Sequence, residues 1–514
     1  MLQIKNLSIT MEINNHTILK DFTFHLAPHH RAAIIGEEGN GKSTLLKILH
    51  DPELVSSYAS YSGQISRDGM KTGYLPQELS TQDGEKDVYT FLSEEPGFFD
   101  LLPMQLHETA RLVGLDAEIF YSDRKMYTFS GGERIKLQIA RILFGNPDLY
   151  LLDEPTNDID LATVRWLEGF LLSLDRPVIY ISHDEALLEN TANCIIHIEQ
   201  LRKKQVPRCT VYSGSYSEYV EARASGFAHQ AQMARSEKEA FDEKMDKWRQ
   251  IYQRVNHEQN AITRGNPSGG RLLKKKMKSV LATGRRFERE KENMTQMPEY
   301  EDAIDLAFDA VDIMPGRLLA DFRLDRLTVG ARTLSKDIRL VIRSGDHIGI
   351  VGPNGCGKTT LLRLVSQFLL EKYGSKAAYM PQNYEESLDF SVPVLDFLAP
   401  SGDKADKTRA MTFMGSLKYT ENEMYASASR LSGGQKAKLY FLKMALTQPQ
   451  ILILDEPTRN LSPLSGPVLR ETLAGYSGTI VSVSHDRKYL SEVCDTLYRL
   501  TDSGLVEVRD TEEL

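Results

Sequence analysis

Two glycine-rich segments combine the residue types that bind a chain of phosphates. Each has the pattern Gly-x-x-x-x-Gly-Lys-Ser/Thr, in which a lysine and a hydroxyl follow flexible backbone. Backbone N–H groups of such a loop surround the β- and γ-phosphates of a nucleotide, the lysine binds the same phosphates, and the hydroxyl binds Mg²⁺. The predicted nucleotide-binding residues are Gly36, Glu37, Glu38, Gly39, Asn40, Gly41, Lys42, Ser43 and Thr44, and in the second segment Gly352, Pro353, Asn354, Gly355, Cys356, Gly357, Lys358, Thr359 and Thr360.

An acidic pair follows a four-residue apolar run in each half of the chain. These pairs are Asp153-Glu154 and Asp455-Glu456. Apolar runs of this kind are typical of buried parallel strands, whose carboxyl ends face the ligand. We therefore predict that Asp153 and Asp455 hold Mg²⁺ through water, together with the hydroxyls that follow the two lysines. Glu154 and Glu456 are predicted to be catalytic, as general bases for an attacking water.

Two histidines also end strand-like apolar runs, and they recur in the same motif order. His183 follows Val178–Ile181, and His485 follows Ile480–Val483 with one serine between. An imidazole at the carboxyl end of such a strand can contact the γ-phosphate. Both histidines are therefore predicted to belong to the catalytic groups.

The chain is an internal duplication, since five motifs occur twice in one order. The phosphate loop is followed by Pro-Gln, Ser-Gly-Gly, Asp-Glu-Pro-Thr and Ser-His-Asp in both copies. From the Ser-Gly-Gly motif to the histidine, the two copies differ by a constant 302 positions. Each phosphate loop lies between a strand-like run and a helical pattern, the context of a nucleotide-binding α/β domain. We predict an α/β fold with domains at residues 1–216 and 301–514.

Length and composition exclude several classes of protein. The chain has 514 residues, of which 41% are hydrophobic and 26% charged, so it is long enough for about three ordinary globular domains. No apolar run approaches the roughly 20 residues of a membrane helix, and no signal-peptide pattern precedes the first strand-like segment. The four cysteines lack zinc-site spacing and are expected to be reduced. We therefore expect a cytoplasmic protein that does not contact membranes.

Residues 217–300 separate the two copies and have a different character. Apolar residues recur there at the spacing of a coiled-coil seam, first at Phe241, Met245, Trp248, Tyr252 and Val255, then at Leu273, Met277, Val280 and Phe287, with Gly284 leaving a gap. Residues 259–270 are rich in turn formers and are predicted to continue neither helix. This pattern predicts an antiparallel helical hairpin whose first helix, from about 217 to 258, is roughly 60 Å long and projects beyond a globular domain.

The net charge of −9 argues at first against a nucleic-acid partner, but the charge is unevenly distributed. Residues 254–291 contain eleven basic and three acidic residues, a net charge of +8. A solvated helix face normally mixes both signs, whereas one dominant sign suits contacts with RNA phosphates. The predicted RNA-contacting residues are Arg264, Arg271, Lys274, Lys275, Lys276 and Lys278.

These motifs resemble those of the ATP-binding cassette superfamily, and the Ser-Gly-Gly signature is the most specific of them. In that superfamily the signature of one cassette closes over ATP and Mg²⁺ held by the other. The resemblance implies a first composite site made of Gly36–Thr44, Gln77, Asp153, Glu154 and His183 with Ser432, Gly433 and Gly434. It implies a second composite site made of Gly352–Thr360, Gln382, Asp455, Glu456 and His485 with Ser130, Gly131 and Gly132. Gln77 and Gln382 are assigned to the metal sites.

Two cassettes joined by a helical hairpin resemble the ABC-F family in particular. The segments Asp153–Asn157, Asp455–Leu461 and Tyr212–Tyr219 look like that family. Its members bind ribosomes near the tRNA exit site when loaded with ATP and extend the linker toward the peptidyl-transferase centre. The resemblance implies a monomeric ATPase with intramolecular cassette pairing, whose partners are large-subunit ribosomal RNA and peptidyl-site tRNA.

The subtype is a further expectation. The interval from glutamine to signature is 53 residues in the first copy and 50 in the second, which leaves no room for the arm insertion of some housekeeping relatives. The chain also ends 29 residues after His485 without a basic tail. These features resemble the antibiotic-resistance members that protect ribosomes. A housekeeping translation factor that relieves stalled ribosomes, an exporter subunit and a DNA-repair ATPase are the alternatives.

Both copies depart from the family pattern. Ile13 and Val329 stand where an aromatic residue usually stacks on adenine, which leaves GTP use open. Glu37 and Glu38 put acid into the first phosphate loop, and Glu133 stands where the second copy has glutamine. We therefore expect the two sites to be inequivalent.

Overall fold

The computed structural model describes residues 2–13, 15–67, 69–201, 205–261, 267–299, 308, 313–330, 332–384, 392–417 and 419–508. The chain forms two compact units. One is Ser217–Tyr300, and the other comprises Met1–Tyr216 with Glu301–Leu514. No described helix has the length and apolar character that crossing a bilayer requires.

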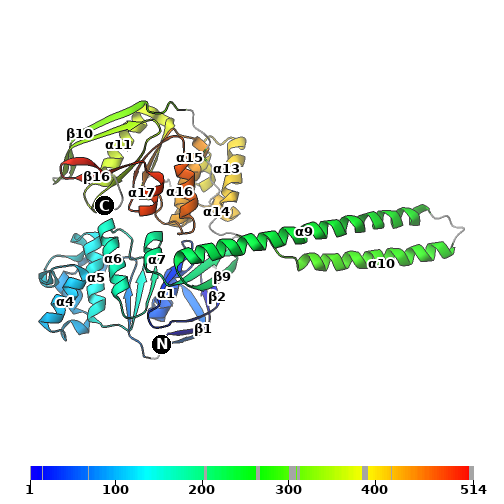
Figure 1. Cartoon of the computed structure of the whole chain (residues 1–514), viewed down its shortest axis with the longest axis horizontal. Helices are drawn as coiled ribbons and strands as arrows, with labels where there is room; N and C mark the ends of the chain where they lie inside the picture. The colour runs from blue at the N-terminus through cyan, green and yellow to red at the C-terminus, as the bar shows by residue number, and fades with distance from the viewer. Residues whose placement is uncertain are drawn as a thin grey trace. The chain divides into compact units, whose positions relative to one another are not determined.

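The first cassette contains strands β1 to β9 and helices α1 to α7. Its strands are β1 (Gln3–Met11), β2 (His16–His25), β3 (Arg31–Ile35), β4 (Ala59–Ser66), β5 (Thr72–Leu75), β6 (Leu149–Asp153), β7 (Val178–Ile181), β8 (Cys194–Gln200) and β9 (Val206–Ser213). Its helices are α1 (Lys42–His50), α2 (Thr81–Glu85), α3 (Val88–Ser93), α4 (Pro103–Val113), α5 (Gly131–Phe144), α6 (Leu161–Ser173) and α7 (Glu185–Thr191). Figure 1 draws this cassette in blue to cyan.

The second cassette contains strands β10 to β17 and helices α11 to α17. Its strands are β10 (Leu318–Val329), β11 (Arg332–Arg343), β12 (His347–Val351), β13 (Ala377–Met380), β14 (Ile451–Asp455), β15 (Thr479–Val483), β16 (Thr496–Thr501) and β17 (Gly504–Val508). Its helices are α11 (Lys358–Tyr373), α12 (Val394–Leu398), α13 (Lys404–Ser416), α14 (Glu421–Tyr425), α15 (Gly433–Thr447), α16 (Gly466–Ala474) and α17 (Arg487–Val493).

The two cassettes have the same central sheet. The strand order is β5-β6-β7-β3-β8-β9 in the first and β13-β14-β15-β12-β16-β17 in the second. In each sheet the last pair, β8–β9 or β16–β17, is antiparallel and the other pairs are parallel. A separate antiparallel sheet accompanies each, β2-β1-β4 in the first cassette and β10-β11 in the second. The prediction of two tandem α/β cassettes is confirmed.

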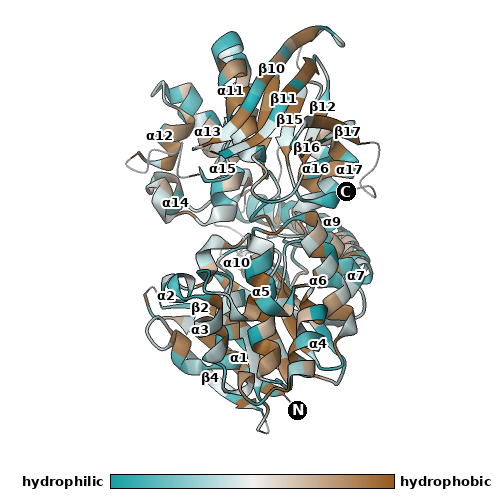
Figure 2. Ribbon diagram, turned by 90° about the vertical axis from the view of Figure 1, so that its left-hand side faces the viewer, coloured by the Kyte–Doolittle hydropathy of each residue, from teal (hydrophilic) through white to brown (hydrophobic). Residues whose placement is uncertain are grey.

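The central strands are almost completely buried, which explains their unbroken apolar sequences. Every residue of β6 and of β14 is buried, including the aspartate that ends each strand. Helix α1 packs its Leu45, Leu46 and Leu49 into the core beneath β3 and β6. Strand β10 is more exposed, and its buried and exposed residues are interspersed along the strand. Figure 2 accordingly shows both hydrophobic (brown) and hydrophilic (teal) stretches in it. The core therefore holds the strand ends, and the residues that follow them, in fixed positions.

The second unit is an antiparallel pair of long helices, α9 (Tyr216–Ala261) and α10 (Pro267–Glu292), as Figure 1 shows. Phe241 and Phe287 meet edge to face with ring centroids 6.2 Å apart. The Trp248 indole donates a hydrogen bond to the Val280 carbonyl at 2.8 Å. Gly284 leaves room for this indole, since a Cβ there would lie 2.9 Å from Trp248 Cζ2. The helical hairpin was therefore predicted correctly, and the structure adds that the gap at Gly284 accommodates Trp248.

The helices extend further into residues 259–270 than predicted. α9 continues to Ala261, and α10 already begins at Pro267. Proline suits the first position of a helix because its missing N–H has no intrahelical partner there. Residues 262–266 lie outside the described part of the chain, and with them the predicted contact residue Arg264.

Candidate functional site

Each phosphate loop wraps around its own lysine. Lys42 begins α1, and its Nζ donates hydrogen bonds to the carbonyls of Gly36 at 2.8 Å and Glu37 at 2.9 Å. Lys358 begins α11 and makes the two equivalent bonds at 2.8 and 3.0 Å. Gly36 has φ +144°, and a Cβ there would lie 2.2 Å from a backbone oxygen of β8. The glycines therefore allow a loop whose lysine lies directly beneath the backbone amides.

In each phosphate loop, the hydroxyl that follows the lysine lies beside an aspartate that ends a strand, β6 in the first cassette and β14 in the second. The Ser43 hydroxyl donates to Asp153 Oδ1 at 2.8 Å, and the Thr359 hydroxyl donates to Asp455 Oδ1 at 3.4 Å. Two oxygen donors, completed by phosphate and water, suit Mg²⁺, which rarely uses an all-protein cage. The predicted pairs of metal ligands are therefore close together and chemically suitable.

Glu154 is surrounded by hydrogen-bond donors. Its carboxylate accepts from the Gln77 amide at 2.9 Å and from the Asn157 amide at 2.6 Å. His183 Nε2 lies 3.3 Å from the other oxygen. Burial would raise the pKa of Glu154, but His183, Lys42 and Asn157 outweigh it and lower the pKa to about 2. Glu154 is consequently a fixed, ionised carboxylate.

Glu456 has the opposite electrostatic environment. It accepts the backbone N–H of His485 at 3.2 Å, and the His485 ring lies further away, with Nε2 3.7 Å from the carboxylate. Burial and the neighbouring Asp455 charge raise the pKa of Glu456 to about 8. Burial and the Lys358 charge lower the pKa of His485 to about 3, so the ring is neutral. The pKa values of the two glutamates are thus shifted in opposite directions although their motifs match.

Both glutamates have left-handed backbone conformations, which are uncommon for residues with a side chain. Their φ angles are +49° for Glu154 and +52° for Glu456. Such strain persists only where the surrounding structure enforces it, and it is frequent at functional sites. The buried strand before each glutamate supplies that enforcement and aims the carboxylate away from the sheet.

The signature motifs form the N-termini of α5 and α15. The hydroxyls of Ser130 and Ser432 accept the N–H three residues later, and Glu133 and Gln435 return the bond to the serine N–H. Glu133 stands where the second copy has Gln435 and forms the same capping box. Gly131 approaches the loop that follows β6 in its own cassette so closely that a Cβ would lie 2.1 Å from the Asp158 carbonyl oxygen.

In the first composite site, the acidic residues of the phosphate loop bind the signature of the second cassette. Glu38 Oε2 accepts the Gly434 N–H at 2.5 Å. Glu37 Oε1 accepts from Lys438 Nζ at 2.9 Å and from the Ser465 hydroxyl at 3.0 Å. Burial raises the pKa of Glu37, but the Lys438 charge outweighs it and holds the pKa below its usual value. The carboxylates of Glu37 and Glu38 thus accept hydrogen bonds from backbone and side-chain donors of the second cassette.

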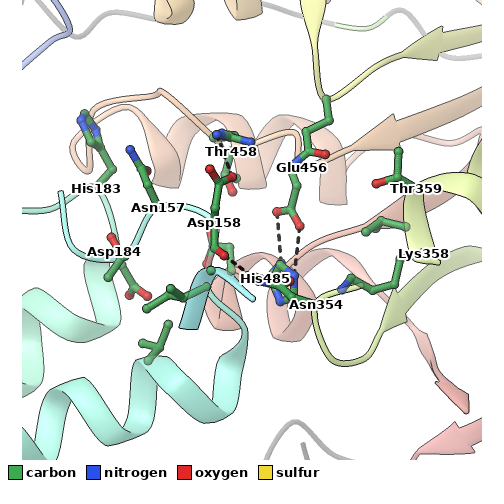
Figure 3. A pocket seen from close by; sticks show the side chains of 18 of the residues that line it. Asn157, Asp158, His183, Asp184, Asn354, Lys358, Thr359, Glu456, Thr458 and His485 are labelled. Carbon is green, nitrogen blue, oxygen red and sulfur yellow. Dashed lines mark hydrogen bonds and ion pairs between the residues drawn. The ribbon is translucent and has the colours of Figure 1, made fainter. Parts of the chain in front are cut away.

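The second composite site instead surrounds a cavity of about 710 Å³. Its lining contains Ser130 and Gly131 together with Lys358 and Thr359, and none of residues 36–44. Figure 3 shows side chains of both cassettes facing this cavity. Where the first loop has Glu38, the second has Asn354, whose amide donates to the Asp158 carbonyl at 2.6 Å. The lining also includes Gln382, Glu456 and His485.

The sequence reasoning missed several residues of these sites. Asp158 pairs with Arg459 at 3.0 Å and receives the Asn354 amide. The Tyr74 hydroxyl donates to Asp153 at 3.2 Å. Asp158 and Arg459 lie within four residues of the glutamates predicted to be catalytic, so their position in the motifs is a usable signal. For Lys438 no comparable signal exists, because its partner lies in the other cassette.

The predicted adenine-side and RNA-side residues occupy different environments. Val329 lines the cavity of the second composite site, whereas Ile13 is 87% exposed. On α10, the side chains of Arg271, Lys274, Lys275, Lys276 and Lys278 are exposed. None of these five forms an ion pair with another described residue. The basic face of the hairpin is therefore available to a partner.

Comparisons with known proteins agree with this architecture. A family model described as "ABC transporter" matches residues 19–157 and 335–459. The chain is 28% identical over 557 aligned residues to ABC transporter F family member 2 of Arabidopsis thaliana, covering 98% of this chain and 77% of that protein. It is 26% identical over 541 residues to the energy-dependent translational throttle protein EttA of Escherichia coli (strain K12), covering 95% and 90%.

The fold also matches a solved structure. It is similar to a chain in the crystal structure of the complex of archaeal ribosomal stalk protein aP1 and archaeal ribosome recycling factor aABCE1. The TM-score is 0.59 at 18% identity, with 98% of this chain and 90% of that chain covered. At this identity the likeness describes the fold.

Proposed function

Because the chain belongs to the ABC-F family of ATP-binding cassette proteins, we propose that its ATPase acts on the ribosome and not on a membrane transporter. The chain is an ATP hydrolase that converts ATP and water to ADP and phosphate. What remains to be argued is which residues perform this reaction and what the hydrolysis drives.

We assign the phosphates to the two glycine-rich loops and their lysines. In each composite site the signature N–H groups of the opposite cassette approach the γ-phosphate, which the positive end of a helix favours. Ser43 with Asp153, and Thr359 with Asp455, are the proposed protein ligands of Mg²⁺, with Gln77 and Gln382 beside them. The metal supplies charge stabilisation for the transferred phosphoryl group.

Glu154 and Glu456 are the proposed general bases. Water attacks the γ-phosphorus, its proton passes to the glutamate carboxylate, and the bond from the γ-phosphorus to the bridging oxygen breaks to leave ADP. His183 and His485 are the proposed groups that orient the γ-phosphate. Glu456 must be ionised for this step. Burial is the main cause of the raised pKa of Glu456, and a cation beside Asp455 would offset the second cause, the repulsion from Asp455.

The observation that carries the ribosomal proposal is the exposed basic face of α10. Its unpaired lysines and arginine lie on a helical hairpin that neither composite site uses. Lysine and arginine side chains free of protein partners are available for phosphate contacts. We propose that Arg264, Arg271, Lys274, Lys275, Lys276 and Lys278 contact large-subunit ribosomal RNA, with peptidyl-site tRNA as a further partner.

We propose further that the ATP-bound protein occupies the region near the tRNA exit site and directs the hairpin toward the peptidyl-transferase centre, where it displaces antibiotics. One observation favours a second candidate. The similarity to a protein named a translational throttle supports a housekeeping factor that relieves stalled ribosomes. Both candidates use the same ATPase and the same hairpin, so they differ only in outcome.

The decisive experiment combines Glu154→Gln with Glu456→Gln. With hydrolysis blocked, ATP should hold the protein on purified 70S ribosomes in a sedimentation assay, whereas ADP should not. Ribosome binding that is absent with both nucleotides contradicts the proposal. The same double variant carrying Lys42→Ala and Lys358→Ala is the matched control, because it removes the phosphate lysines and should not respond to ATP.

A charge-reversal test isolates the hairpin. Lys274→Glu/Lys275→Glu/Lys276→Glu should weaken ribosome binding at least tenfold and reduce its salt dependence, because three phosphate contacts are lost. The control Lys238→Glu/Lys247→Glu/Arg249→Glu reverses three exposed bases on α9 and should have a smaller effect. Equal losses in the two variants refute a specific role for α10. Drug susceptibility of cells with and without residues 260–270 then separates resistance from housekeeping.

A further inference from the structure

The pseudo-equivalent helices of the two cassettes carry opposite charges at two positions. The constant offset of 302 equates α6 with α16 and α7 with α17. It equates Glu168 with Arg470 and Glu185 with Arg487. The first cassette therefore has acid at both positions, and the second has base at both.

These four residues form two ion pairs between the cassettes. Arg470 binds Glu185 through two hydrogen bonds, Nη1 to Oε1 at 2.5 Å and Nη2 to Oε2 at 3.1 Å. Arg487 likewise binds Glu168 through Nη1, at 3.4 Å, and through Nη2. Each pair joins the α6-type position of one cassette to the α7-type position of the other. The two pairs are therefore one contact made twice, with the signs exchanged.

A third position changes in step with the first two. Asn190 donates its amide to Glu168 Oε1 at 3.2 Å, whereas the equivalent Glu492 accepts from Arg470 Nε at 2.7 Å. Lys488 adds a second cation to Glu185, with Nζ 3.2 Å from Oε2. Asn190 and Glu492 thus each have the chemistry that the charged residue of their own cassette requires, and Lys488 supports Glu185 from the other cassette.

The pairs are shielded from water, so a mismatch would be costly. The exposed fractions are 3% for Arg470 and 7% for Glu185, and 19% and 13% for Arg487 and Glu168. Two first cassettes brought together in this geometry would oppose Glu168 with Glu185 twice, and two second cassettes would oppose Arg470 with Arg487 twice. A buried charge that faces a like charge is strongly unfavourable.

We infer that Glu168, Glu185, Arg470 and Arg487 select the pairing partner of each cassette, admitting a first cassette to a second and excluding two of a kind. The selected partner is the other cassette of the same chain. These four residues lie where the two cassettes meet, so the inference does not depend on the ribosomal role proposed above.

Charge reversal tests this selection in the full-length protein. Variant A, Arg470→Glu/Arg487→Glu, makes all four positions acidic, and variant B, Glu168→Arg/Glu185→Arg, makes all four basic. Each should lower the melting temperature by about 5–10 °C, the effect of breaking buried ion pairs. Variant AB, which carries all four substitutions, restores opposite charges and should recover part of the loss, because Glu492 and Lys488 remain beside positions 470 and 185 and then face like charges. Arg176→Glu, at an exposed pair with Asp148, is the control and should be nearly silent.

Mixing gives the sharper readout. Equimolar A and B complement each other only between chains, so light scattering should show a 1:1 complex of twice the 58.1 kDa chain mass, while wild type and variant AB stay monomeric. If A or B does not fold alone, the recovery in AB still decides, because AB carries the same substitutions. The inference is overturned if AB is as unstable as A and B together, or if folded A and B do not associate.

Discussion

The two composite sites use the same motifs but engage their opposing signatures differently. In the first, the carboxylate of Glu38 holds the Gly434 N–H, and Glu37 is buried against Lys438. In the second, Asn354 turns to the Asp158 carbonyl, and an open cavity separates the phosphate loop from the signature. A nucleotide γ-phosphate must compete with an internal anion in the first site, and it meets no such competitor in the second.

The two glutamates proposed as general bases also differ between the sites. Glu154 is tied to Gln77 and Asn157 and is ionised, whereas Glu456 has fewer donors and a raised pKa. A carboxylate held by several donors is a weaker base than one that is free to accept a proton. Two copies of a motif can therefore have the same residues and still differ in catalytic capacity. We expect most of the ATP hydrolysis to occur at the second site.

The largest effect is expected from removing the partner of Glu37, whose side chain is only 13% exposed. Lys438→Met leaves a carboxylate without its cation, which should lower the free energy of unfolding by about 3 kcal/mol, measured by denaturant titration. Because the pKa of Glu37 is lowered in the folded protein, the pair stabilises above the ordinary pKa of 4.5 and loses that contribution as the pH falls below it. Wild type and variant should therefore converge in acid. A loss independent of pH contradicts the ion pair.

Turnover of the two glutamine variants compares the sites directly. Glu456→Gln should reduce steady-state ATP hydrolysis about 100-fold, the contribution of a general base. Glu154→Gln should reduce it no more than about threefold, since the first site contributes little. Phosphate release under saturating ATP measures both, and equal rates for the two variants would break the comparison.

Exchanging the loop residues should move nucleotide affinity between the sites. Glu38→Asn frees the Gly434 N–H and should tighten binding of a fluorescent ATP analogue about tenfold at the first site, measured with Lys358→Ala to silence the second. Asn354→Glu, measured with Lys42→Ala, should weaken the second site by a similar factor. Unchanged affinity in both would show that the loop carboxylate does not compete with phosphate.

The smallest effect concerns the donors around Glu154. Asn157→Ala removes one hydrogen bond to the carboxylate and should raise the residual turnover of the Glu456→Gln variant about threefold. Arg459→Ala, at the equivalent position of the second cassette, serves as the comparison in the Glu154→Gln background. A further decrease after Asn157→Ala would mean that Asn157 supports catalysis at the first site.

Local chemistry was predictable from the sequence because the motifs specify it. Glycines before Lys42 require a tight loop, and the unbroken apolar run before Asp153 requires a buried strand, so the positions of both follow from adjacent residues. The seam of the hairpin was equally local, including the gap at Gly284. Helix ends were less certain, since Pro267 reads as a turn residue and in fact begins α10.

The contacts between cassettes were not predictable in the same way. Glu37 and Lys438 are 401 positions apart, and Arg470 and Glu185 are 285 apart. Such pairs depend on how two finished domains dock, which no periodicity or spacing within one domain encodes. The acidic residues of the first loop did reveal that the sites differ, but not which donors they would bind.

The indole of Trp248, which packs against Gly284, also gives the hairpin an intrinsic fluorescent probe. The chain has two tryptophans, and the other, Trp166, lies in α6 with its indole bonded to the Leu112 carbonyl. Trp166→Phe would leave Trp248, in the helical hairpin, as the single tryptophan of the chain. Its fluorescence would then report the hairpin's local polarity, and any quenching by a bound partner, without an attached dye.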